Sequence, residues 1–412
     1  MSHPSPTAHP GDALTTGQRL VFILSLGALV ALGPFTIDAY LPAFPAIAAE
    51  FGASEAAIQL TLTGTLVGFG IGQLVVGPWS DKVGRRMPLL VATGVHIVAS
   101  LGIALAPDVL WVGLLRVLQG IGAAGGGVVA MAMVRDLFSG QRLIRMLARL
   151  ALITGLAPIL APLIGSQLLL LVDWRGIFWV LMGYGIVVIV LGAILIGETR
   201  PRERREAAGH RTARERYAAL FGDRVFVGIA LVGGMTFSAI FTYISASSFL
   251  FQEVFGLDPQ QYGILFGVNA VGLTVCSQLS SRVMRKVAPP MVIAVTLTGM
   301  FLSAVAILVG TLAGGGIWAA AIPLFFLLSF AGATFPAVQV TALAHHGEEA
   351  GTAASLLGAL NFGLAGLISP IVGALGIGSA LPMAAVQSVC LGLGLVVLWT
   401  VVRPRGVEPI AH

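Results

Sequence analysis

The stretch GPFTIDAYLPAFP, residues 33–45, lies inside an apolar run that extends over residues 20–48. A helix needs about 20 apolar residues to cross a bilayer, so this run is long enough to span one. Asp38 lies within it, where a carboxylate is costly and is rarely kept for structure alone. Pro34 and Pro42 flank Asp38, and neither can donate a helix hydrogen bond. We therefore expect a loosened membrane helix whose acid faces a wet cavity within the protein; the alternative is a permanently protonated Asp38 that bonds a neighbouring helix.

The composition is that of an integral membrane protein, because 57% of the 412 residues are hydrophobic and only 10% are charged. We expect an all-α protein with twelve spanning helices in two six-helix bundles. The apolar segments cover residues 19–48, 55–79, 87–106, 109–134, 144–171, 175–197, 225–250, 262–282, 290–312, 317–342, 352–376 and 379–402. This divides the chain into a tail (1–18), a first bundle (19–197), a charged linker read as a solvated hinge (198–224), a second bundle (225–402) and a second tail (403–412).

The distribution of Lys and Arg gives the orientation in the membrane. If the N-terminus is cytoplasmic, the inner loops hold nearly all basic residues and the outer loops hold only Arg175. This is the positive-inside rule, so we expect both termini in the cytoplasm. The basic residues occur in short groups between apolar runs, which argues against a nucleic-acid partner. The two cysteines lie in apolar segments and are interpreted as packing residues; with His345 and His346 assigned to a solvated loop, we expect no metal site.

Arg116, in the stretch LLRVLQGIGAAGGG, is the second ionisable side chain that we place deep in the membrane. A helix rises about 1.5 Å per residue, which puts Arg116 and Asp38 at a similar depth, roughly 12–15 Å below the outer surface. Two opposite charges at one depth on two helices predict a pair that is made and broken as the helices move. The alternative is a static buried ion pair, which contributes little to stability.

The loop between the second and third segments reads GPWSDKVGRRMP, residues 77–88. Gly84 permits a tight reversal, and Asp81 is an anion that can meet a helix N-terminus or an arginine. The loop resembles the signature loop of the major facilitator superfamily of transporters. The resemblance implies that the loop locks one conformation by bridging the halves, whereas simple topological anchoring would explain its arginines alone. The motif residues are Gly77, Asp81, Gly84, Arg85 and Arg86.

The fifth segment contains ITGLAPILAPLIGSQ, in which small residues recur every four positions and give one flat helix face. It resembles the antiporter motif of drug exporters, with Ala-Pro in place of the usual Gly-Pro. Together with TIDAYLPA, RVLQG and SASSFLFQEVFG, it is similar to the Bcr/CflA subgroup, which exports bicyclomycin-like and phenicol-like drugs, and this likeness covers essentially the whole chain. The motif residues are Ala157, Pro158, Ala161, Pro162 and Gly165.

Several side chains are candidates for a substrate cavity, because a wall of aromatic and hydroxyl groups suits amphipathic, weakly polar ligands. For each of them alone, ordinary helix packing is the alternative interpretation. The candidates are Tyr40, position 58 beside Gln59, Thr61, Phe237, Phe241, Asn269 and Asn361.

The resemblance implies the twelve-helix major facilitator fold, with substrate and proton sites between the bundles near mid-membrane. We expect a proton-coupled antiporter in the inner membrane of a bacterium that exports small amphipathic antibiotics, with Asp38 as proton acceptor and Arg116 as its modulator. The sequence carries no motif of an enzyme or ATPase, so we expect no enzymatic activity and no cofactor beyond the proton gradient. The expected partners are a small-molecule substrate, protons and the bilayer, and we expect a monomer. A proton-coupled metabolite exporter or uptake symporter and a non-transporting membrane sensor are the alternatives.

Overall fold

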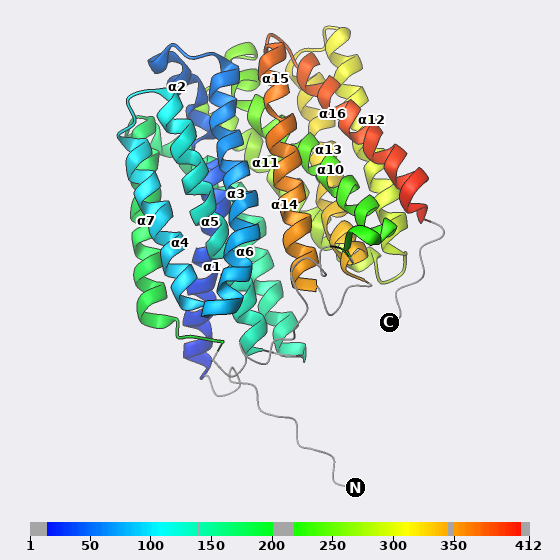
Figure 1. Ribbon diagram of the computed structural model, residues 1–412. Helices are drawn as coiled ribbons and strands as arrows, with labels where there is room; N and C mark the ends of the chain where they lie inside the picture. Colours follow the sequence, from blue (N-terminus) through cyan, green and yellow to red (C-terminus); the bar gives the residue numbers. More distant parts are fainter. Residues whose placement is uncertain (1–14, 139, 201–217, 219, 345–349, 405–412) are drawn as a thin grey trace.

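The computed structural model describes residues 15–138, 140–200, 218, 220–344 and 350–404, and every regular element in these residues is a helix (Figure 1). The first half comprises α1 (Thr16–Asp38), a 3₁₀ turn (Leu41–Ala43), α2 (Phe44–Phe51), α3 (Glu55–Val83), α4 (Arg86–Ala104), α5 (Val109–Leu137), α6 (Gly140–Leu168) and α7 (Trp174–Leu195). The second half comprises α10 (Arg224–Phe249), α11 (Pro259–Val283), α12 (Pro289–Leu312), α13 (Gly316–Leu343), α14 (Ala350–Ile368), α15 (Pro370–Leu375) and α16 (Leu381–Val397). Single π-helical turns extend α10 (Leu250–Val254) and α16 (Leu398–Val402).

The twelve predicted apolar segments are all helical in the structure. Eleven of them are long and apolar enough to cross a bilayer within the described part of the chain. The twelfth is α6, whose apolar part covers Ile153–Leu168. Two of the spanning units contain a helix break: α1 and α2 form one unit, and α14 and α15 form the other. Each break is followed by a proline, which cannot donate a helix hydrogen bond.

Short polar caps set where these helices begin. The side chains of Ser54, Asp108, Asp173 and Asp258 each accept a backbone N–H from the first turn of the helix that follows. Such caps lie at the membrane surface, where the first N–H groups of a helix have no partner of their own. The starts of α3, α5, α7 and α11 are therefore each fixed by a single polar residue between long apolar runs.

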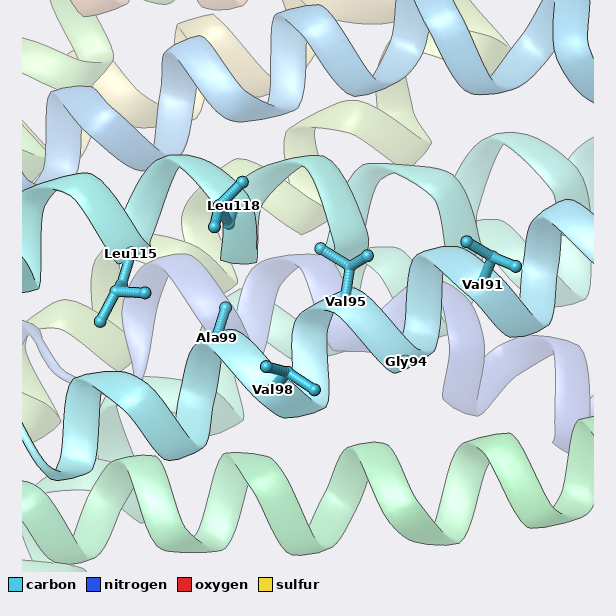
Figure 2. A pocket seen from close by; sticks show the side chains of 7 residues that line it. All are labelled: Val91, Gly94, Val95, Val98, Ala99, Leu115 and Leu118. Carbon is cyan, nitrogen blue, oxygen red and sulfur yellow. The ribbon is translucent and has the colours of Figure 1, made fainter.

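The outer surface of the bundle is apolar, as a bilayer requires. Val98 is 70% exposed and Leu171 is 81% exposed, although both are large aliphatic residues. A groove of about 460 Å³ lies between α4 and α5 on this surface, and the residues that line it are labelled in Figure 2. Its lining consists of apolar residues alone: Val91, Gly94, Val95, Val98, Ala99, Leu115 and Leu118. We interpret it as part of the lipid-facing surface, since no polar group is available there to orient a drug-like ligand.

The two halves lie side by side, with the start of α1 and the end of α16 at one end of the bundle, here called the terminal face (Figure 1). The opposite end is the distal face. One buried apolar core runs through both halves and includes the contact between Phe44 and Phe249, whose ring centroids are 5.8 Å apart. A second core belongs to the first half alone and includes Phe22 and Met133, toward the terminal face. The apolar core is therefore shared between the halves mainly on the distal side.

Hydrogen bonds also join the halves at the distal face. Gln252 Nε2 donates to the Pro42 carbonyl at 3.2 Å, and Gln260 Nε2 donates to the Ser166 carbonyl at 2.9 Å. On the other side of the interface, the side chain of Gln59 accepts the Gly373 N–H at 2.9 Å. Glu55 likewise accepts the Ile377 N–H at 2.9 Å. All four bonds would have to break for the distal face to open.

Candidate functional site

The helix break beside Asp38 is the centre of the candidate site. α1 ends at Asp38, and its last backbone hydrogen bond runs from the Ala39 N–H to the Phe35 carbonyl at 3.1 Å. Pro34 lies inside the helix without ending it, whereas Pro42 lies in the 3₁₀ turn that follows. Asp38 is only 4% exposed, and its Oδ1 has no hydrogen-bond partner. The break thus places a carboxylate inside the protein with an unused acceptor atom.

Arg116 binds the carbonyl that this break leaves free. Its Nη1 donates to the Thr36 carbonyl at 2.8 Å and to Gln119 Oε1 at 2.6 Å. Its guanidinium lies over the ring of Tyr40, 3.9 Å from the ring centroid, while Nε and Nη2 have no hydrogen-bond partner. Arg116 and Asp38 interact electrostatically, yet within the described residues they form no ion pair shorter than 4.0 Å. The two predicted charges are neighbours that do not touch.

The second half faces Asp38 with a hydrogen-bonded group of polar side chains. Tyr243 and Tyr262 both interact electrostatically with Asp38 across the interface. Asn269 Nδ2 donates to the Tyr243 hydroxyl at 3.2 Å, and the hydroxyls of Ser247 and Tyr262 are 2.9 Å apart. The carboxylate therefore lies within electrostatic range of Arg116 from the first half and of two tyrosines from the second.

The remaining cavity candidates divide into two groups. Tyr40 and Thr61 lie beside Arg116, with 3.4 Å between their hydroxyl oxygens. The expectation of a polar cavity residue at position 58 is wrong, because this residue is Ile58, which is fully buried and apolar. The polar neighbour is Gln59, which serves the contact between the halves at the distal face.

Phe237 and Phe241 belong to an aromatic cluster that crosses the interface. Their ring centroids are 4.7 Å apart, and Phe362 lies 4.9 Å from Phe237. Phe69 of the first half stacks on Phe362 at 5.1 Å. Asn361, one residue before Phe362, has a buried Oδ1 without a partner. An apolar aromatic surface beside an unused amide acceptor is a suitable contact for a weakly polar ligand.

The signature loop forms an ion-pair network at the terminal face. Arg85 Nε bonds Asp136 Oδ2 at 2.7 Å, and Arg85 Nη1 bonds Asp81 Oδ1 at 2.8 Å. Burial opposes the charge of Arg85, but the hydrogen bonds and charges of Asp136 and Asp81 outweigh it and hold the pKa of the guanidinium above its usual value. Gly84 has φ +104° at the end of α3, a conformation that side-chain-bearing residues rarely adopt.

The beginning of the predicted linker packs on this loop. Glu198 accepts the backbone N–H groups of Arg85 and Arg86 and so caps the start of α4. Arg200 pairs with Asp81 at 2.5 Å. These first linker residues are thus docked on the first half, whereas residues 201–217 lie outside the described part of the chain. Gly77 of the loop motif lies near the second half, since a Cβ there would be 3.8 Å from Ser355 Oγ.

The antiporter-like helix α6 lies between the α1 break and the second half. Gly165 packs on the backbone of Ala39 so closely that a Cβ would overlap the Ala39 carbonyl. Ala157 and Ala161 are buried, and Pro158 and Pro162 lie within the helix. On its other side, α6 meets Gly263 of α11, where a Cβ would be 2.6 Å from Ser166 Oγ. A movement of α6 would therefore displace the backbone of Ala39, the residue that follows Asp38.

His96 is a buried residue of this site that sequence reasoning missed. Its Nε2 lies 2.9 Å from the hydroxyl of Thr36, the residue whose carbonyl binds Arg116. An ionisable side chain in the middle of a membrane segment was the available signal. No group of three or more His, Cys, Asp or Glu suited to a metal occurs in the described residues, and His345 and His346 lie outside them.

Comparison with known proteins gives a consistent family assignment. The model of the Major Facilitator Superfamily matches residues 24–370. The chain is 35% identical to the uncharacterized MFS-type transporter YdgK of Bacillus subtilis over 95% of this chain and 98% of that protein. It is 29% identical to a bicyclomycin resistance protein homolog of Haemophilus influenzae over 91% and 94%, and 30% identical to the multidrug resistance protein MdtL of Escherichia fergusonii over 69% and 71%.

Solved structures agree on the fold. A bacterial homolog of the human lysosomal transporter Spinster, in an inward-facing and unoccupied conformation, has a TM-score of 0.72 at 15% identity, covering 95% of this chain and 98% of that one. The human organic anion transporter MFSD10 has a TM-score of 0.70 at 17% identity, covering 93% and 100%.

Proposed function

Because this chain belongs to the major facilitator superfamily of transporters, we propose that it is a proton-coupled antiporter that exports small amphipathic, weakly polar drugs, of the phenicol or bicyclomycin kind. The observation that carries the proposal is the buried, unpaired Asp38 beside an Arg116 that binds a backbone carbonyl instead. The relatives named for bicyclomycin and multidrug resistance support the substrate class.

The arrangement suits a switch better than a static ion pair. A permanent pair would satisfy the oxygens of Asp38 and the nitrogens of Arg116 with each other, but Oδ1, Nε and Nη2 all lack partners here. Such unused groups are costly inside a membrane and persist where another conformation uses them. In the proposed cycle, Asp38 takes a proton from the outside and releases it to the cytoplasm as drug binds, while Arg116 moves between the Thr36 carbonyl and the carboxylate. One deep acid implies one proton per cycle.

The contacts between the halves support a definite access side. The distal face holds the shared core and four hydrogen bonds between the halves. The positive-inside rule would make the terminal face cytoplasmic, with the protein in the inner membrane of a bacterium. We therefore propose that this conformation is closed to the outside. Drug would reach Asp38 and the Phe237 cluster from the cytoplasm once the remaining contacts between the halves open, such as the hydrogen bond from Thr274 to the Gly155 carbonyl.

The test is substrate-induced proton release in inside-out membrane vesicles that carry a pH gradient. Phenicols, bicyclomycin-like compounds, dyes and lipophilic cations are added in turn to wild type, Asp38→Asn and Asp108→Asn. Asp108 caps α5 at the distal surface, and Asn caps a helix as well as Asp does, so this control keeps the same chemical change away from the site.

We expect a phenicol-like compound to collapse the gradient with wild type and Asp108→Asn and not with Asp38→Asn. Equal responses of wild type and Asp38→Asn would overturn the role of Asp38. If no compound collapses the gradient, the proposed drug export is wrong and transport of a dedicated metabolite becomes the proposal.

A further inference from the structure

His96 is a fully buried imidazole in α4 to which the proposed cycle gives no role. Its Nε2 is 2.9 Å from the hydroxyl oxygen of Thr36 in α1. That hydroxyl has a single hydrogen, and it donates to the Leu32 carbonyl at 2.6 Å. The oxygen of Thr36 is therefore the acceptor for His96, which assigns the proton of the neutral imidazole to Nε2.

His96 closes a ring of hydrogen bonds through three helices. From α5, Arg116 donates to the Thr36 carbonyl and to Gln119 Oε1. Gln119 Nε2 donates to the Ser100 hydroxyl in α4 at 2.8 Å, and Ser100 donates to the His96 carbonyl at 2.7 Å. The ring is completed by the hydrogen bond from His96 Nε2 to the Thr36 hydroxyl in α1. All five side chains are fully buried, so each bond in the ring counts in a site without competing water.

Two glycines let neighbouring helices approach His96 closely. A Cβ at Gly122 in α5 would lie 2.6 Å from the backbone nitrogen of His96. A Cβ at Gly185 in α7 would lie 3.3 Å from His96 Nδ1. Helices α5 and α7 therefore approach His96 closely, α5 at its backbone and α7 at its imidazole.

The same surroundings keep His96 neutral. Its Nδ1 is buried and has no hydrogen-bond partner, so a second N–H there would be a buried donor without an acceptor. Arg116 faces His96 and opposes a second positive charge nearby. The groups that face Asp38 are Arg116 from α5, Tyr40 next to the break, Tyr243 from α10 and Tyr262 from α11. His96 therefore does not take up the transported proton.

We infer that His96 is a positioning residue: it anchors Thr36 as the resting partner of Arg116 and so sets how readily Arg116 turns to Asp38. This inference rests on the proposed proton role of Asp38. Without the anchor, Arg116 leaves the Thr36 carbonyl more easily and stabilises the Asp38 carboxylate, which then takes up its proton at lower pH. Loss of one buried neutral hydrogen bond predicts an apparent proton affinity about threefold to tenfold weaker.

The experiment is an infrared pH titration of purified protein in lipid nanodiscs, following the protonated carboxyl band that Asp38→Asn removes. Thr36→Val keeps the carbonyl and nearly the shape of the side chain but removes the hydroxyl. His96→Leu removes the donor, and His96→Gln retains an N–H near the position of Nε2. We expect Thr36→Val and His96→Leu to lower the midpoint equally, the double variant to lower it no further, and His96→Gln to stay near wild type.

Unchanged midpoints in Thr36→Val and His96→Leu, or shifts that add in the double variant, overturn the inference. If His96→Leu does not fold, the midpoints of Thr36→Val and His96→Gln still test the inference. A second readout needs neither transport nor a titrating Asp38: the ¹⁵N guanidinium resonances of Arg116, assigned with Arg116→Lys, should shift in Thr36→Val and stay in place in His96→Gln. If no carboxyl band depends on Asp38, the proposed function fails. The Arg116 resonances then still test whether His96 anchors Thr36 as the partner of Arg116.

Discussion

Removing Arg85 should destabilise the first half far more than removing its neighbour Arg86. The Arg85 side chain is 6% exposed and Asp136 is 17% exposed, so their bond at 2.7 Å is shielded from water. Deleting one partner of a buried ion pair costs about 3–5 kcal/mol, because the other charge loses a group that offset its desolvation. Asp136 keeps a hydrogen bond from Thr199 at 3.2 Å, which places Arg85→Ala at the lower end, about 3 kcal/mol.

This free energy predicts a clear change in melting temperature. For a domain the size of the first half, each kcal/mol shifts Tm by about 2–4 °C, so Arg85→Ala should lower it by about 6–12 °C. Arg86→Ala is the matched control, since Arg86 is exposed and an exposed charge is worth about 1 kcal/mol or less. Arg85→Lys keeps the charge and loses the two-pronged contact with Asp136, so it should fall between them.

The assay is thermal unfolding in nanodiscs, followed by circular dichroism for the single variants and for Arg85→Ala combined with Asp136→Ala. The double variant should lose less than the sum of the two single losses, since both single variants lose the same contact between Arg85 and Asp136. Equal Tm values for Arg85→Ala and Arg86→Ala would refute the assignment of Arg85 as a buried structural charge.

Two further predictions concern the surroundings of Asp38 and the distal face. Gly165→Ala should lower stability by about 1–3 kcal/mol and slow transport, because its Cβ meets the Ala39 carbonyl; Gly183→Ala, with no atom within 4 Å of the new Cβ, should do neither in the same melting and flux assays. Gln59→Leu should favour opening of the distal face, seen as faster thiol labelling of Ala43→Cys, a fully buried position there, after Cys276 and Cys390 are replaced by Ala; an unchanged labelling rate would count against this contact as a latch.

The sequence alone determined the membrane class, the twelve helical segments and the two deepest charges. Hydropathy and charge cost are properties of each segment by itself, so the segment around Asp38 and the one around Arg116 could be recognised without knowing their neighbours. The signature loop was equally recognisable from its residues, and the break after Asp38 followed from Pro42.

Only the tertiary structure decided which groups meet. Arg116 binds the Thr36 carbonyl and not Asp38, and His96 reaches Thr36 from 60 positions further along the chain. Gln59 of the first half meets the backbone of Gly373 in the second half. These outcomes depend on how each helix is rotated and how closely it approaches the next, at places such as Gly122 and Gly165. Such rotations arise from packing across many helices at once, and apolar membrane segments carry little periodicity that would reveal them.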